Sequence, residues 1–366
     1  MVNFFKKFGL VLVGLVLGLV FIECLLRLLP SGNKAGFADT DESGKLYAYD
    51  SGLGWRLKPD VKAGQKIQDF SVEYRTNSEG FRDDKTFGPK KAWGKTRVLV
   101  FGDSFAFGVG VPLEKTFTKQ LEGGYSGKYE ALDFGVSGYD PGQYLLAAKK
   151  EAAKYRPDVV VFALYLGNDI EDLPLSHLSQ GTRYFKPYFE LDGGKLVLKN
   201  VPVPEGSPSS TAATDVRIKT SWFSGAAGWL SGLRTAALFK NILKDPLYPV
   251  LAKLGLVKDI QDYKPNLDLL QAVLTDAERT FGVGHFAVLI IPSINGSHSY
   301  LEKKFASSVD SALTARKIPF YDLMPDISAS KQSYYYFPHE GHFNEAGHAL
   351  AAGKLAKLLD ELANRK

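Results

Sequence analysis

The sequence predicts an α/β fold, in which a parallel β-sheet carries helices on both faces. From about residue 95 onward, short apolar runs rich in β-branched residues alternate with longer stretches of helical character. Strands that alternate with helices in this way are typical of a parallel sheet. The chain has 366 residues, of which 45% are hydrophobic and 23% charged, so it can form an ordinary globular core.

Each expected strand is a short apolar run that ends at turn or polar residues. The five expected strands are Arg97–Phe101, Glu130–Phe134, Asp158–Leu164, His285–Ile291 and Ile318–Asp322. The helices are expected near residues 113–121, 142–155, 264–280, 300–315 and 344–363. Together these segments define a main domain over residues 96–174 and 262–366.

Two further regions flank or interrupt the main domain. Residues 30–95 are rich in Gly, Asp, Lys and aromatic residues, with short extended pieces between turn signals, and we expect a linker and a small β-rich extension. Residues 175–261 interrupt the alternation and are expected to form an insertion or cap. A hairpin with a glycine turn is expected from Tyr184 to Gly194. A long insertion after a strand at the catalytic face often carries specificity.

The N-terminus has the pattern of a membrane anchor. Lys6 and Lys7 precede an apolar stretch over residues 8–29, and a helix needs ~20 residues to cross a bilayer. We expect residues 1–7 to be a cytoplasmic tail and the rest of the chain to lie outside the cytoplasm, in a bacterial periplasm or at the cell surface. The alternative is a cleaved signal peptide, but no convincing small-x-small cleavage site follows the stretch.

Charge and cysteine content exclude some classes of function. The formal net charge is +5, and the Lys and Arg residues are scattered rather than gathered into the basic stripe that nucleic-acid binding needs. Cys24 is the one cysteine, so the chain can form no intrachain disulfide and no cysteine-based metal site.

Ser104 is the candidate nucleophile. It stands in Val98-Leu-Val-Phe-Gly-Asp-Ser104, where a buried strand ends and a helix is expected to begin. Open α/β sheets place their ligands at this carboxyl edge. A serine hydroxyl is a weak nucleophile unless a base takes its proton. Serine is also a favoured helix N-cap, which is the structural alternative for this residue.

His342 is the best placed of six histidines to act as that base. It lies in the loop before the last expected helix, which Asn344 could cap. Glu340, two residues upstream, is the obvious carboxylate to orient the imidazole, although it could equally be a solvated loop acid. His339 could orient it more weakly.

The remaining fragments supply donors for an oxyanion. Gly138 follows the second expected strand and lets the main chain approach a substrate, and Asn168 follows the third strand with a side-chain amide. The backbone N–H of Ser104 is a third donor. A tight turn at Gly138 and an Asx-turn at Asn168 are the structural alternatives. All of these fragments are expected at one edge of the sheet.

The four fragments resemble the signature blocks of the SGNH (GDSL) hydrolase superfamily. Gly102-Asp103-Ser104 resembles the nucleophile block, Gly138 the glycine block, Gly167-Asn168-Asp169 the asparagine block, and Glu340-Gly-His342 the final block. Asp133 stands where asparagine is more usual, and Glu340 where Asp is more usual. The segments Gly54–Pro59 and Thr76–Asp83 look like the membrane-anchored bacterial branch of the superfamily.

The resemblance implies a flavodoxin-like three-layer sandwich with a five-stranded parallel sheet. It also implies acyl transfer from esters through an acyl-Ser104 intermediate, without a cofactor or a metal. Hydrolysis of a small-molecule or glycan acyl ester is the expected activity, and transfer of the acyl group to a cell-surface glycan is a close variant.

Two other classes of function remain as alternatives. His339, His342 and His348 cluster like metal ligands, but their spacing does not match the His-Glu-x-x-His pattern, and the other fragments would be left unexplained. A catalytically inactive binding or assembly module is the third hypothesis. Labelling of Ser104 by a fluorophosphonate distinguishes it from an enzyme.

Overall fold

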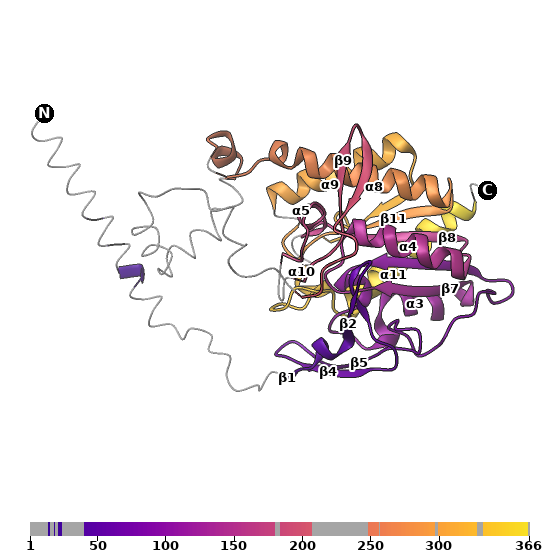
Figure 1. Cartoon of the computed structure of the whole chain (residues 1–366). Coiled ribbons are helices and arrows are strands. Elements are labelled where there is room, and N and C mark those ends of the chain that lie inside the picture. Colours follow the sequence, from indigo (N-terminus) through magenta and orange to yellow (C-terminus); the bar gives the residue numbers. More distant parts are fainter. Residues whose placement is uncertain are drawn as a thin grey trace, which may run out of the picture. The chain divides into compact units, whose positions relative to one another are not determined.

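The computed structural model describes residues 40–179, 184–206, 248–255, 257–296, 299–327 and 332–364, together with residues 14, 18 and 21–23. The chain divides into two compact units, one formed by Met1–Phe37 with Thr211–Lys258 and the other by Ala38–Ser210 with Asp259–Lys366. The elements discussed below belong to the second unit (Figure 1).

Two sequence predictions fall largely outside these residues. The predicted anchor over residues 8–29 is described only at residues 14, 18 and 21–23, and most of the predicted cap, from 207 to 247, is not described. Within the described part of the chain, no helix has both the length and the apolar character that a membrane span requires.

The second unit is built around the predicted five-stranded parallel sheet. Its strands are β6 (Thr96–Gly102), β7 (Tyr129–Gly135), β8 (Val159–Tyr165), β11 (Phe286–Ile291) and β12 (Phe320–Asp322). They lie in the order β12-β11-β8-β6-β7, and every neighbouring pair is parallel. The first strand of the sheet in the chain, β6, therefore lies between the second and the third, which is the flavodoxin-like strand order.

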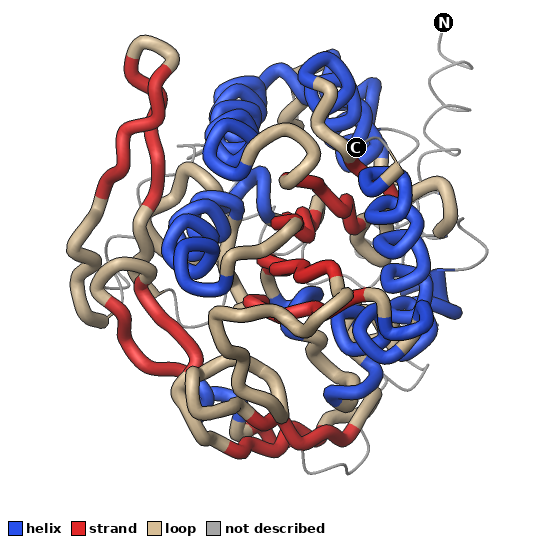
Figure 2. Tube along the Cα trace, turned by 90° about the vertical axis from the view of Figure 1, so that its right-hand side faces the viewer, coloured by secondary structure: helices blue, strands red, loops and turns tan. Residues whose placement is uncertain are grey.

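Helices cover both faces of the sheet because alternate strand residues point to opposite sides. Leu99 and Phe101 of β6 belong to one apolar cluster, and Val98 and Val100 to the other. On the first face pack α4 (Pro141–Tyr155), α8 (Lys264–Phe281) and α9 (Tyr300–Arg316); on the second pack α2 (Ser104–Phe107), α3 (Phe117–Gly123) and α11 (Glu345–Ala363). Figure 2 shows the strands between these helices.

Most helix boundaries follow local capping signals. Asp140 forms a capping box with Gln143 at the start of α4, and Asn344 accepts from the amide of Ala346 at 2.9 Å at the start of α11. The helix predicted near 113–121 is instead divided at Thr116. This residue is extended and caps α3, so the first part is the 3₁₀ turn η2 (Leu113–Lys115).

The structure contains the predicted β-rich extension, which packs into the same apolar core as the main sheet. Strands β1 (Thr40–Asp41), β4 (Lys62–Lys66) and β5 (Ser71–Arg75) form one antiparallel sheet, and β2 (Tyr47–Asp50) pairs with β3 (Gly54–Leu57). Leu46, Trp55 and Tyr74 are buried in the cluster that lies on the first face of the main sheet. The extension is therefore part of this compact unit.

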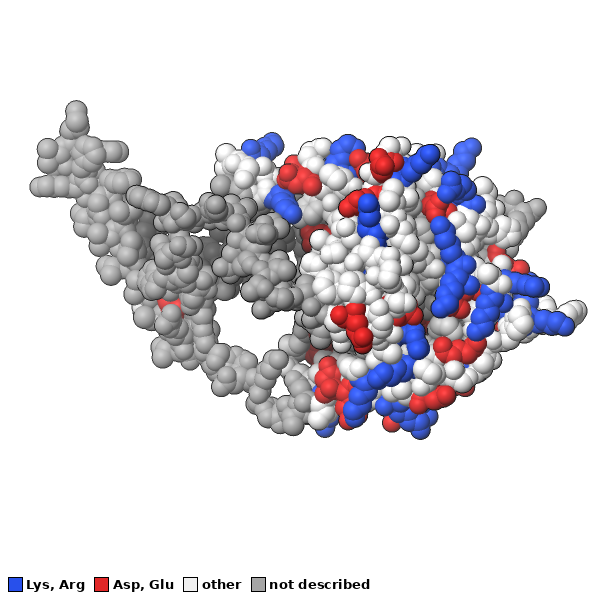
Figure 3. Space-filling view, viewed as in Figure 1, with Lys and Arg blue, Asp and Glu red and all other residues white. Residues whose placement is uncertain are grey.

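The predicted hairpin at the start of the insertion consists of β9 (Tyr188–Asp192) and β10 (Lys195–Lys199). Gly193 and Gly194 make its turn, both with positive φ. The remaining short elements are η1 (Ser43–Leu46), η3 (Tyr125–Gly127), α5 (Asp169–Asp172), η5 (Ile260–Tyr263) and α10 (Gln332–Tyr335). On the face in Figure 3, side chains of both charges are scattered over the described surface.

Candidate active site

The carboxyl ends of β6, β7 and β8 meet at the point where the strand order reverses. In open α/β sheets this switch point leaves a crevice that binds ligands. Here the crevice is a pocket of about 560 Å³. Every residue predicted for the site lines this pocket: Ser104, Gly138, Asn168, Glu340 and His342.

Ser104 is held in a tight connection between β6 and α2. Asp103 caps the helix by accepting from the amide of Phe105 at 2.8 Å. Gly135, at the end of β7, lets α2 approach closely, because a Cβ there would lie 2.2 Å from the amide nitrogen of Phe107. Burial raises the pKa of Asp103 to about 6. The turn places Ser104 in the lining of the pocket.

His342 joins Ser104 and Glu340 in one line of hydrogen bonds. Its Nε2 lies 2.6 Å from Ser104 Oγ, and its Nδ1 lies 2.7 and 2.6 Å from the two carboxylate oxygens of Glu340. A neutral imidazole with its proton on Nδ1 donates to Glu340 and leaves Nε2 to accept from the serine hydroxyl. This is the arrangement that acyl transfer by a serine requires.

The imidazole and its carboxylate are fixed by their own loop. Glu340 also accepts from the backbone N–H of His342 at 3.1 Å. The ring of His342 packs against Phe105 of α2, with centroids 4.8 Å apart. Gly341, between the two triad residues, has φ of +88°, a conformation that glycine adopts most readily. The loop therefore needs glycine to turn the carboxylate back onto the ring.

The residues predicted to donate to an oxyanion line the same pocket as Ser104. Asn168 donates one hydrogen of its amide to Asp172 at 3.1 Å, which fixes the side chain and leaves the second hydrogen for the pocket. Gly138 has φ of +81°, and a Cβ there would meet Leu178 at 3.1 Å. The amide of Ser104 is at the first position of α2, where helix amides have no partner within the helix.

The three histidines considered as metal ligands, His339, His342 and His348, contact different partners. His339 contacts Asp69, and His348 is buried and accepts from the amide of Phe117 at 3.2 Å. Burial lowers the pKa of His348 to about 3, so it is neutral. Among the described residues, no group of three or more His, Cys, Asp and Glu residues is arranged to hold a metal ion. His339 also does not orient His342.

Sequence reasoning missed the part that the extension plays at the site. Trp55 donates from Nε1 to the carbonyl of Ser137 at 3.1 Å, next to Gly138, and Tyr139 donates back to the carbonyl of Trp55. Arg82 is fully buried and donates to three carbonyls at the end of α2 and just beyond it, those of Phe107, Gly108 and Val111. The resemblance to a known family at Thr76–Asp83 indicated that this segment matters, but it did not predict which carbonyls Arg82 contacts.

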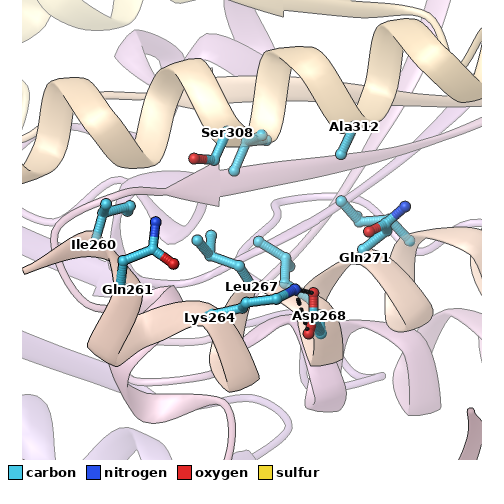
Figure 4. Close-up of a pocket in the computed structure, with 11 residues that line it drawn as sticks. Ile260, Gln261, Lys264, Leu267, Asp268, Gln271, Ser308 and Ala312 are labelled. Carbon is cyan, nitrogen blue, oxygen red and sulfur yellow. Dashed lines mark hydrogen bonds and ion pairs between the residues drawn. The ribbon is translucent and has the colours of Figure 1, made fainter.

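A second pocket lacks such a constellation. It has a volume of about 360 Å³ and lies between η5, α8 and α9 (Figure 4). Its charged residues, Lys264 and Asp268, pair with each other at 3.0 Å. The pocket at the carboxyl edge of the sheet is therefore the candidate active site.

No protein-family model matches the chain, and no curated protein matches its sequence. Several solved structures are similar to it in fold. The chain is similar to the psychrotrophic esterase EstA from Pseudoalteromonas sp., with 13% identity, a TM-score of 0.40, and coverage of 74% of this chain and 100% of that one.

Two further solved structures are similar to the same extent. One is a member of the lipolytic G-D-S-L family from Veillonella parvula, with 12% identity, a TM-score of 0.39, and coverage of 72% and 98%. The other is the acetylxylan esterase Axe2 from Geobacillus stearothermophilus, with 12% identity, a TM-score of 0.38, and coverage of 74% and 96%. At these identities the likeness concerns the fold alone, and the chemistry of the site rests on the residues and distances given above.

Proposed function

We propose that this protein is a serine-dependent ester hydrolase that works through an acyl-Ser104 intermediate. The observation that carries the proposal is the contact of 2.6 Å between His342 Nε2 and Ser104 Oγ, with Glu340 at 2.6 Å on the other side of the ring. A nucleophile, a base and an orienting carboxylate are thereby joined by hydrogen bonds in the lining of one pocket.

In the first half of the reaction, Ser104 Oγ bonds to the ester carbon as its proton passes to His342 Nε2. The carbonyl electron pair moves onto oxygen, where Asn168 and the amides of Gly138 and Ser104 donate to it. The intermediate then collapses, the bond to the alcohol oxygen breaks, and that oxygen takes the proton from His342. Glu340 accepts from Nδ1 of the imidazolium and stabilises it.

In the second half, water attacks the acyl carbon and gives its proton to His342. Collapse of this second intermediate breaks the bond to Ser104 Oγ, which takes the proton back. The acid leaves, and the site returns to its starting state.

The direct test is hydrolysis of p-nitrophenyl acetate by the full chain. Ser104→Ala and His342→Ala should each lower kcat by ~10³-fold or more while leaving the protein folded, because they remove the nucleophile and the base. Ser311→Ala, on the exposed surface of α9, is the control and should turn over like the wild type. Wild-type turnover by Ser104→Ala would contradict the proposal. Adding glycans to the assay shows whether a sugar hydroxyl replaces water as acceptor.

The enzyme would act outside the cytoplasm, tethered by residues 8–29. The support is the apolar stretch with Lys6 and Lys7 before it. When membranes are washed with carbonate, the full chain should stay in the pellet, and a chain that starts at residue 38 should be released. Release of both would contradict the anchor, and a shortened mature N-terminus in mass spectrometry would indicate a signal peptide.

A further inference from the structure

Asp69 is a carboxylate of the β-rich extension that contacts the catalytic loop, residues 337–342. It lies in the turn between β4 and β5, and its side chain is only 4% exposed. Its Oδ2 accepts from the backbone amides of His339 at 2.8 Å and Glu340 at 2.9 Å. Its Oδ1 lies 2.6 Å from Nδ1 of His339. Asp69 thus binds the two consecutive amides that lead into the triad acid.

The surroundings of each contact show which of them can set the geometry of the loop. Burial opposes ionisation of Asp69, but the hydrogen bonds from His339 and Glu340 outweigh it and lower its pKa. The side chain of His339 is 60% exposed, so water competes with its contact to Asp69. The two amides are part of the backbone and are held at fixed positions, so they are the contacts that can set the geometry of the loop.

Apolar contacts reinforce this junction. Phe70, beside Asp69, packs on Phe337 at the start of the catalytic loop, with ring centroids 5.1 Å apart. Gly110 lies against both rings, and a Cβ there would come within 2.5 Å of Phe337 and 2.8 Å of Phe70. The loop is closed by its own bond from the amide of Phe337 to the carbonyl of His342 at 2.8 Å. The β4–β5 turn and this closed loop therefore meet as two packed surfaces.

We propose that Asp69 is a positioning residue for the triad, so that the β-rich extension is part of the catalytic machinery. Asp69 holds the backbone of Glu340, Glu340 orients His342, and His342 accepts from Ser104. A displacement of 1 Å far from the reacting atoms can cost ~10²-fold in rate. The inference rests on the proposed function of the site, since it assigns Asp69 a role in that reaction.

Variants of the full chain test it with p-nitrophenyl acetate. Asp69→Ala removes all three contacts and should lower kcat by ~10–10²-fold, with KM within ~2-fold, because substrate binding is left intact. Asp69→Asn should recover most of kcat, because one carbonyl oxygen can still accept from both amides.

Glu79→Gln is the matched control. Glu79 also joins the extension to the main domain, where Lys154 and Tyr155 of α4 donate to it, but it lies away from the pocket. Its variant should keep wild-type kcat. If both Asp69→Ala and Glu79→Gln lower the melting temperature but only Asp69→Ala lowers kcat, the result supports the role of Asp69 in positioning the triad.

Wild-type kcat in Asp69→Ala overturns the proposal, and so does an equal loss of kcat in Glu79→Gln. If Asp69→Ala does not fold, Asp69→Glu tests the same claim, because it keeps the charge and moves the acceptor by one methylene group. It should lose kcat by ~10-fold or more, and wild-type kcat overturns the proposal. Labelling by a fluorophosphonate distinguishes failure of the proposed function from failure of the role of Asp69. If the wild type is not labelled at Ser104, the proposed function fails. If the wild type and Asp69→Ala are labelled at equal rates, only the role of Asp69 is overturned.

Discussion

At the scale of single residues, the sequence predicted that Glu340 would stand where an aspartate is more usual in the SGNH superfamily, which the motifs resemble. The longer side chain is accommodated because the loop turns at Gly341 and brings both carboxylate oxygens within 2.7 Å of His342 Nδ1. The backbone N–H of His342 adds a further bond to the same carboxylate. A glutamate two residues before the histidine can therefore reach the ring that it orients.

Glu340→Gln should lower kcat for p-nitrophenyl acetate by ~10²-fold or more, but less than Ser104→Ala does. The amide can still accept from the imidazole, but it does not stabilise the imidazolium, and its NH₂ group can favour the wrong tautomer. Steady-state kinetics of both variants check this. An unchanged kcat in Glu340→Gln would mean that another acid serves the triad.

Asn168→Ala should lower kcat by ~10²–10³-fold, because it removes one donor to the oxyanion. Its KM should change little, since the ester carbonyl of the ground state carries less charge than the intermediate. Asn266 of α8 provides a control position. Its side-chain amide donates to the carbonyl of Ile170 at 2.8 Å. If Asn168→Ala and Asn266→Ala have the same kcat, Asn168 is not an oxyanion donor.

At the scale of elements, β7 carries a buried acid that the fold would hold more easily as a neutral group. Asp133 is 5% exposed and accepts from the amide of Gly135 at 2.7 Å and the hydroxyl of Thr118 at 2.8 Å. Burial raises its pKa to about 7. Between pH 4 and pH 7 the unfolded chain loses this proton while the folded chain keeps it, so the free energy of unfolding falls as pH rises.

Asp133→Asn should remove that part of the pH dependence. Asparagine can accept from Gly135 and donate to Thr118 without a buried charge. Relative to the wild type, the variant should gain roughly 3 kcal/mol in unfolding free energy between pH 5 and pH 8. Urea unfolding of both proteins at the two pH values measures the difference. A constant difference between them would show that Asp133 ionises normally.

The sequence predicted the elements of the main sheet closely where the signal is local. An apolar run bounded by turn residues sets each strand, and the capping residues Asp140 and Asn344 set two helix starts. The predictions were less accurate where a single residue changes the backbone. Strand β12 begins at Phe320 rather than Ile318, whose amide still bonds to Leu313 at the end of α9.

At the scale of the whole molecule, the site is completed by segments that are distant in the sequence. Residues 104, 138 and 168 could be placed together from the sequence because each follows a strand, and strand ends meet at one edge of a parallel sheet. Asp69 and His339 are 270 positions apart, and no local pattern links them. Arg82 likewise binds carbonyls that any residue would offer, so its role becomes visible only in the folded structure.

The most direct test of the central claim is intact-mass analysis of the full chain after brief reaction with a fluorophosphonate, with the modified peptide identified. The account predicts one adduct, on Ser104, which is absent in Ser104→Ala and forms at least ~10²-fold more slowly in His342→Ala, because the hydroxyl then lacks its base. No adduct on Ser104, or an adduct that forms at the wild-type rate in His342→Ala, would contradict it.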